Sequence, residues 1–365
     1  MEIDFIIGIG LFVFMIAAVM LYTINYFSGI GTPTEMIEYR DKAISILGKM
    51  FSETSGSDIL SDPRVSVKLY RIPILVTENS GIDRTNEPFF AVLNFDRDCE
   101  GRAWNNTIRV YDENFTEVLS RLSYNNFCSD HLLRNSTISL KINISANEKK
   151  RFFVYYSNNS EILAPNYTGF DLMAYYTFDE GTGTLLKDYS GFENNGTLKN
   201  GTNTCYNNDC PTWVNGKFSY GLQFDGINDY VDCGDVGTVK TIEFWIKTNT
   251  LTEDILQLNS SVNVSVSEGT ISANGFSSPT IYVNGAEGST LTTQWSHVAI
   301  TTNSGINANE VKLGAVGTSY FNGTIDEVRI WNRVLTTDEI LIHNASHPLD
   351  IKLYPEETIS VISHS

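Results

Sequence analysis

The hydrophobic pattern divides the chain into one long apolar run, one helical stretch and many short alternating segments. Residues 5–27 form an uncharged apolar run of about 23 residues, which is long enough for a helix to span a bilayer. The segment before this run carries Glu2 and Asp4 but no basic residue, so it lacks the leader of a cleaved signal peptide. We therefore expect residues 1–30 to form an uncleaved transmembrane anchor.

Residues 31–56 are expected to form a short amphipathic stem helix and a linker. Between Thr34 and Glu53 the apolar residues recur at helical spacing, and Glu35 and Glu38 favour the N-terminal end of a helix. An anchor followed by such a helix resembles the stem of archaeal type IV pilin-like proteins. The stretch from Ser52 to Pro63 is small and polar, as is typical of a linker.

Residues 57–166 are predicted to form a β-sandwich domain. Seven short runs of β-branched and aromatic residues are separated by polar, turn-rich segments, which is the spacing of an antiparallel sandwich. The runs are VSVKLYR, PILVTE, PFFAVLNF, TIRVYDE, EVLSRLSY, STISLKINI and KRFFVYYSN. No catalytic or metal-binding pattern occurs in this region, so we expect a structural stalk.

Three blocks of sequence in the second half of the chain carry a family resemblance. They are AYYTFDEGTGTLLKDYSGFENNGT (174–197), LQFDGINDYVDCGD (222–235) and GTIDEVRIWNRVLTTDEI (323–340). In this order they resemble the laminin-G-like, concanavalin A-like lectin/glucanase family. The resemblance implies a two-sheet jelly roll over residues 167–347 that binds sugars or proteins, followed by a C-terminal tail, 348–365. The fold class is therefore expected to be mainly β.

Two tryptophans of this region are candidate ligand-binding residues. In TIEFWIKT the residues Ile242, Phe244 and Ile246 share one face of a strand, and Trp245 lies on the other. Trp331 likewise lies opposite Ile330. Aromatic rings stack well on the C–H faces of sugars, so both could line a binding face. The alternative is that they belong to the core or cover the sheet.

The segment DYSGFENNGT resembles the calcium loop of this family. The resemblance implies a structural Ca²⁺ held by Asp188, carbonyl groups near Gly191, and Asn194, with Asp326 as the second carboxylate. Asp326 has the same parity as Val328 and Ile330, so we expect it to point toward the core. The alternative is that Asp188 caps a turn and that Asp326 only accepts backbone hydrogen bonds.

Glycosylation signals decide the orientation that we expect. Arg40 and Lys42 follow the apolar run, which weakly favours a cytoplasmic C-terminal part. Against this, N-x-[ST] occurs about twice as often as chance predicts. The twelve sites are Asn105, Asn114, Asn135, Asn143, Asn158, Asn166, Asn195, Asn200, Asn259, Asn263, Asn322 and Asn344. We therefore expect a single-pass membrane protein with most of its chain outside the cell.

The cysteines agree with an oxidising exterior. Cys99 and Cys128 fall within one predicted domain, and Cys205 and Cys210 bracket a short polar loop, so we predict one disulfide from each pair. Zinc is the alternative for closely spaced cysteines, but no further CxxC or His-x₃-His pattern accompanies them. Cys233 is left over and is expected to be a buried, inert thiol.

Charge and motif content narrow the function classes. A net charge of −18 without a Lys/Arg cluster argues against a nucleic-acid partner. A glycosidase is the least favoured class, because Asp326 and Glu327 are adjacent and should face opposite sides of a strand. We expect a membrane-anchored, non-catalytic adhesion protein for glycans or a surface protein; the alternative is a structural or pilin-like component that self-assembles. Dense sequons and an acidic chain fit an archaeal host.

Overall fold

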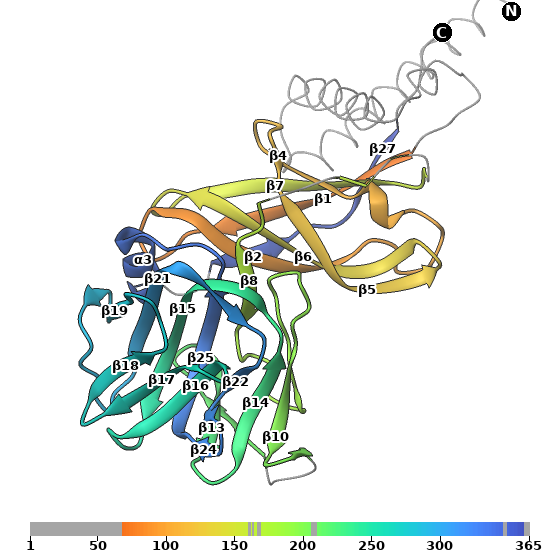
Figure 1. Ribbon diagram of the computed structural model, residues 1–365. Helices are drawn as coiled ribbons and strands as arrows, with labels where there is room; N and C mark the ends of the chain where they lie inside the picture. Colours follow the sequence, from red (N-terminus) through yellow and green to blue (C-terminus); the bar gives the residue numbers. More distant parts are fainter. Residues whose placement is uncertain are drawn as a thin grey trace, which may run out of the picture.

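The computed structural model describes residues 68–159, 162, 164–165, 169–205, 210–345 and 349–360. The predicted anchor (1–30) and stem (31–56) lie outside these residues. Within the described ranges, the structure contains no helix that is both long and apolar enough to cross a membrane. The architecture is mainly β, as expected, and it consists of two sheet-on-sheet domains (Figure 1).

The first domain is a sandwich of two antiparallel sheets. One sheet, here called sheet A, contains β1 (Lys68–Thr77), β3 (Arg109–Asp112), β4 (Glu117–Val118), β7 (Lys149–Ser157), β26 (Asp350–Leu353) and β27 (Glu357–Ser360). The other, sheet B, contains β2 (Arg84–Asn94), β5 (Ser120–Ser129) and β6 (Leu132–Ile144). A short 3₁₀ helix, η2 (Asn105–Thr107), precedes β3. The predicted sandwich is thus confirmed, with its core formed by alternate residues such as Ile72, Ile74 and Val154.

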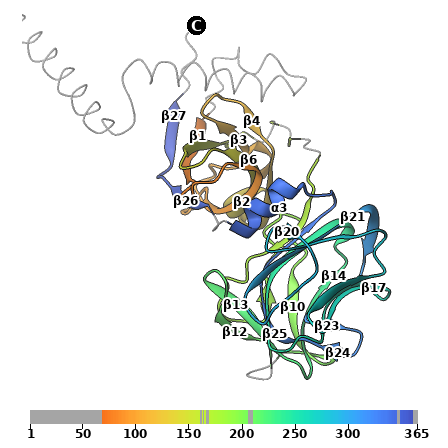
Figure 2. The same cartoon turned by 90° about the vertical axis from the view of Figure 1, so that its left-hand side faces the viewer.

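Residues 350–360 complete the first domain, although the sequence analysis placed them in a C-terminal tail. β26 and β27 both pair with β1, along one edge of sheet A (Figure 2). The edge is interrupted opposite Pro73, which has no N–H to donate and whose carbonyl accepts the N–H of Tyr354. Acidic side chains fix this segment to the first domain. Glu356 accepts hydrogen bonds from Arg102 and Tyr156, and Glu357 forms an ion pair with Arg71. The jelly roll is therefore inserted between two parts of the first domain.

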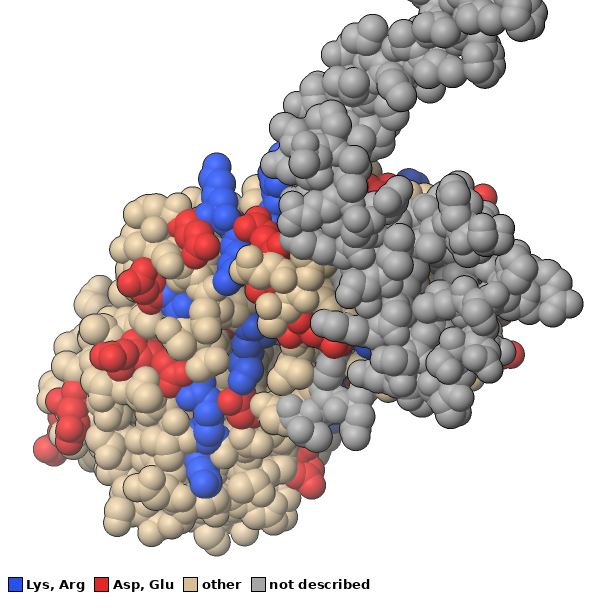
Figure 3. Space-filling model, turned by 90° about the horizontal axis from the view of Figure 1, so that it is seen from above, with Lys and Arg blue, Asp and Glu red and all other residues tan. Residues whose placement is uncertain are grey.

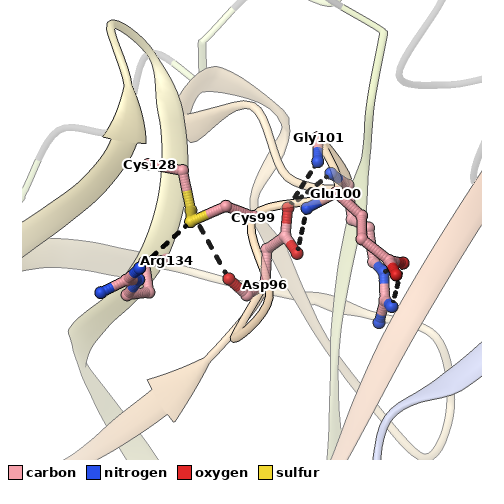
Figure 4. Close-up of a disulfide and its surroundings, with 7 residues drawn as sticks. Asp96, Cys99, Glu100, Gly101, Cys128 and Arg134 are labelled. Carbon is pink, nitrogen blue, oxygen red and sulfur yellow. Dashed lines mark hydrogen bonds and ion pairs between the residues drawn. A yellow bond between two sulfur atoms is a disulfide. The ribbon is translucent and has the colours of Figure 1, made fainter.

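A disulfide ties the loop after β2 to the end of β5. Cys99 and Cys128 are bonded, as predicted, with their Cα atoms 5.4 Å apart (Figure 4). The loop is organised by Asp96, whose carboxylate accepts the backbone N–H groups of Glu100, Gly101 and Arg102. Cys205 and Cys210 form the second predicted disulfide, and Cys233 is free and buried. The two predicted pairings and the burial of a free Cys233 are therefore confirmed.

Removing the first disulfide is expected to destabilise the protein measurably. The bond closes a loop with a sequence separation of 29, so the Cys99→Ser/Cys128→Ser double variant should lose about 3–4 kcal/mol of unfolding free energy. Chemical denaturation without reductant measures this loss. Cys233→Ser is the control for a cysteine change that breaks no bond. A double variant as stable as the wild type would show that the loop is held without the bond.

The second domain is a jelly roll of two large antiparallel sheets (Figure 1). Sheet C contains β8 (Leu172–Tyr176), β12 (Thr212–Asn215), β13 (Tyr220–Asp225), β15 (Gly237–Thr248), β19 (Thr280–Val283), β20 (Ala286–Glu287), β21 (Ser296–Ala308) and β25 (Asn322–Trp331). Sheet D contains β9 (Leu185–Leu186), β10 (Gly196–Asn200), β11 (Asn203–Thr204), β14 (Asp229–Gly234), β16 (Glu253–Asn259), β17 (Val262–Ser267), β18 (Thr270–Asn274) and β22 (Val311–Leu313). A small hairpin pairs β23 (Ala315–Val316) with β24 (Ser319–Tyr320).

The main core of the jelly roll lies between sheets C and D. Ile242, Phe244 and Ile246 of β15 point into it, as their alternation predicts, and so do Val298 and Ile300 of β21. The intervening residues of these strands therefore form the outer face of sheet C. This face is the one that meets the first domain.

A helix and a small second core join the two domains. The helix α3 (Thr337–Ala345) begins with a capping box, in which Thr336 and Glu339 exchange side-chain to backbone hydrogen bonds. Figure 2 shows α3 between the first domain and the upper end of the jelly roll. Its Ile340 packs with Trp331 and Tyr175 on the outer face of sheet C, and Phe90 of β2 packs against the same cluster.

Candidate functional site: the domain boundary

The outer face of sheet C is closed at the domain boundary. Trp331 is 0% exposed and Trp245 is 5% exposed. Trp331 is stacked on His343 of α3, and the Lys217 ammonium group lies 4.2 Å from the centroid of the Trp245 ring. Both tryptophans lie opposite the core residues, as expected, but neither offers a ring face on which a sugar can stack. They cover the sheet, which was the alternative interpretation.

A β-bulge in β25 changes which residues reach this outer face. The register with β15 shifts between the pair Glu243–Arg329 and the pair Trp245–Asp326, and Glu327 has a φ of 51°. Asp326 therefore lies on the face of Trp245, and Glu327 lies on the face of Arg329, which it contacts at 3.1 Å. Both expectations about this strand are wrong: Asp326 does not point into the core, and the two acids share one face.

The shared face leaves Asp326 and Glu327 buried and close together. They are 0% and 3% exposed, and each has one carboxylate oxygen without a hydrogen-bond partner. Burial, together with the Glu327 charge, raises the pKa of Asp326 to about 8. Burial also raises the pKa of Glu327 to about 7, although Arg329 and the Tyr175 hydroxyl oppose this shift. The backbone N–H groups of Lys217 and Phe218 donate to the other carboxylate oxygen of Asp326.

Glu243 is the centre of a buried network on the same face. It is 1% exposed and accepts hydrogen bonds from the Trp331 indole at 3.0 Å and from His343 at 3.0 Å. Two further groups lie near its carboxylate, the His297 ring at 3.5 Å and the Arg329 guanidinium at 4.0 Å. Burial alone would raise the pKa of Glu243, but His343, His297 and Arg329 hold this pKa well below its usual range.

The network crosses the domain boundary through His343. The other ring nitrogen of His343, Nε2, lies 3.6 Å from Glu87 of β2, and Glu87 lies 3.4 Å from Arg84. A second bridge joins Lys141 of β6 to Asp171 at 2.5 Å, and Arg333 holds the other oxygen of Asp171 at 2.8 Å. None of these residues was among the predicted site residues. They are single charges in otherwise ordinary strand and helix patterns, and only the tertiary structure brings them together.

The expected calcium ligands do not assemble into one site. Asp188 is 0% exposed, and its two oxygens accept hydrogen bonds from the N–H of Tyr175, the N–H and hydroxyl of Ser190, and the N–H of Asn194. Gly191 and Asn194 belong to the same loop, but Asp326 lies elsewhere, under residues 216–218. Within the described part of the chain, no three His, Cys, Asp or Glu side chains are grouped so that they could hold a metal ion. The donors around Asp188 occupy the oxygens that a calcium ion needs, so this loop does not fit the ion.

A cleft of about 360 Å³ opens beside the buried network, between the two domains. Its walls come from β2, β6 and β7, from the β3–β4 hairpin, and from residues 169–172 at the start of the jelly roll. Asn86, Asn143, Lys141 and Lys150 provide polar groups, and the rings of Phe170, Tyr175 and Tyr189 also line it. Its volume falls within the range of small-ligand sites, and polar groups beside aromatic rings suit a sugar.

A match to a family model supports a jelly roll of the concanavalin A-like type in the second domain. Residues 270–341 match the model of the concanavalin A-like lectin/glucanases superfamily. No curated protein sequence matches the chain. Among solved structures, the chain is similar to domain 4 of AbnA, a GH43 extracellular arabinanase from Geobacillus stearothermophilus, in complex with arabinotriose. The identity is 19% and the TM-score is 0.33, and the match covers 48% of this chain and 98% of that chain. Trypanosoma rangeli sialidase in complex with the inhibitor DANA is similar at 12% identity and a TM-score of 0.34, over 73% of this chain and 52% of the sialidase.

Proposed function

We propose that the protein is a membrane-anchored surface protein that binds glycans in the cleft between its two domains. The superfamily match at residues 270–341 supports a carbohydrate-binding domain. The cleft carries the proposal, because the outer face of sheet C is closed and the cleft combines aromatic rings with polar groups. The first domain would then form one wall of the binding site as well as a stalk.

The surface of the described residues is compatible with an extracellular, neutral ligand. Eleven of the twelve sequon asparagines are described, all except Asn166, and none of the eleven is buried. Figure 3 shows the molecule from above. On the part of this face that is not drawn in grey, a narrow band of Lys and Arg side chains has Asp and Glu side chains on both sides. Mixed charges of this kind and a net charge of −18 favour a neutral glycan over a polyanion.

Blocking the cleft is expected to abolish glycan binding. Leu119 lines the cleft and is 46% exposed, so Leu119→Trp adds bulk there without disturbing a core. On a glycan array, the full-length wild type should bind a defined set of neutral glycans, and Leu119→Trp should lose at least about tenfold in affinity. Ile227→Trp is the control, because Ile227 is 71% exposed and lies outside the cleft lining.

The same experiment separates the other functions. A wild type that binds no glycan but forms larger species in light scattering would favour the assembly role. Release of sugar from the array would favour a hydrolase and would contradict the non-catalytic proposal. Equal binding by both tryptophan variants would place the glycan site away from the cleft.

A further inference from the structure

The loop that resembles a calcium site lies against β5 of the first domain. The N–H of Tyr124 donates to Glu193 at 2.8 Å, and its hydroxyl donates to the carbonyl of Asp188 at 2.9 Å. The Asn195 Oδ1 atom also lies within hydrogen-bond distance of this hydroxyl, so the two oxygens share its one proton. Tyr124 of β5 therefore contacts three residues of the loop, which are Asp188, Glu193 and Asn195.

Arg121 of β5 provides the positive charge beside this loop. Its guanidinium lies 3.7 Å from the centroid of the Phe192 ring, in a cation–π contact. Burial lowers the pKa of Arg121, whereas the nearby Asp188 and Glu193 charges raise it. The contacts of Arg121 with the loop are therefore its packing on Gly191 and its cation–π contact with Phe192.

Gly191 allows this close approach. Its φ of 94° is in the left-handed region, where residues with a Cβ are strained. A Cβ added at Gly191 would lie 2.8–2.9 Å from three side-chain carbons of Arg121, which is too close for any real contact. The glycine of the Asp-x-Ser-Gly pattern thus leaves room for the Arg121 side chain to pack against the loop.

Two further contacts extend the interface beyond β5. The Tyr189 ring stacks on Phe90 of β2 with centroids 3.9 Å apart, and the Ser139 hydroxyl of β6 donates to the Tyr189 carbonyl at 2.7 Å. All three strands of sheet B therefore contact residues 188–196. The contact is a continuous surface rather than a single ion pair.

We infer that residues 188–196 form the docking site for sheet B. At this site Arg121 and Tyr124 stabilise the loop in place of a calcium ion. Both carboxylate oxygens of Asp188 are already occupied by protein donors, and Arg121 and Tyr124 contact the loop directly. The two domains are therefore joined at this loop without a metal. This inference is independent of the glycan proposal.

The first test asks whether calcium contributes to stability. Thermal unfolding of the full-length protein in detergent should give the same Tm with a chelator and with millimolar calcium. An increase in the Tm of the wild type with calcium would overturn this inference, because the ion would then have its own site in the folded chain.

The second test measures the contact between Arg121 and Gly191. Gly191→Ala is strained at this φ in any background, but its clash requires Arg121. We expect Gly191→Ala to lower the Tm more in the wild type than in the Arg121→Ala background, by about 2–4 °C. The control background is Arg97→Ala, since Arg97 is exposed and belongs to the same domain. An equal loss in all three backgrounds would overturn the inference.

Discussion

Replacing Glu243 with glutamine is expected to lower the free energy of unfolding by about 3–5 kcal/mol. Glutamine keeps the size of the side chain and can still accept from the Trp331 indole, so the change removes the charge and little else. Arg329 is 7% exposed and His343 is 4% exposed, and both lie beside Glu243. Without the Glu243 charge, Arg329 keeps Glu327 as a buried counter-charge, but a buried charge that is incompletely compensated is costly.

Chemical denaturation of the two variants in parallel tests this prediction. The matched control is Glu310→Gln, because Glu310 forms its ion pair with Lys312 at the surface, with 47% of its side chain exposed. This control should change the stability by no more than about 0.5–1 kcal/mol. If the two variants lost the same small amount, the buried network would contribute no more than a surface ion pair.

Replacing Asp326 with asparagine is expected to stabilise the protein at alkaline pH. The pKa of Asp326 is raised by burial and by Glu327 to about 8, and that of Glu327 is raised by burial to about 7. A carboxyl group with a raised pKa in the folded state binds its proton more tightly there than in the unfolded chain. The wild type should therefore lose stability as pH rises from about 5 to 9, and Asp326→Asn should gain on the order of 3 kcal/mol at pH 9.

Melting curves between pH 5 and pH 9 measure the effect. In the wild type the Tm should fall across this range, whereas in Asp326→Asn the fall should be much smaller. Glu268→Gln is the control for removing an acid, because Glu268 is exposed. A wild-type Tm that stays constant from pH 5 to pH 9 would contradict the idea that the two carboxyl groups share one buried face.

The strand pattern predicted the fold well because it depends on local alternation. β15 and β21 have the faces that their sequences indicate, since each buries one face against sheet D. The disulfide pairs were also predictable, because each pair lies within one domain. The segment 350–360 was not, because β26 and β27 are only four residues each and take their structure from pairing with β1, far away in sequence.

The candidate site was less predictable for two physical reasons. Parity along a strand assumes a regular ladder, and the bulge at Glu327 reverses the parity of Asp326 without any glycine or proline to signal it. The second reason is burial by another domain. Glu243 and Trp331 lie on the outer face of sheet C, where α3 and, from the first domain, β2 pack against their cluster.

The pairing of β1 with residues 350–360 also sets an order of events during synthesis. The ribosome makes β1 before the jelly roll and makes its edge partners only afterwards. The jelly roll is encoded without interruption between them, so it can finish folding while β1 still presents unpaired N–H and C=O groups. The domain that comes first in the sequence is therefore the last to be completed. During that interval the exposed edge is a site at which neighbouring nascent chains could pair, and a chaperone that covers β1 would prevent this.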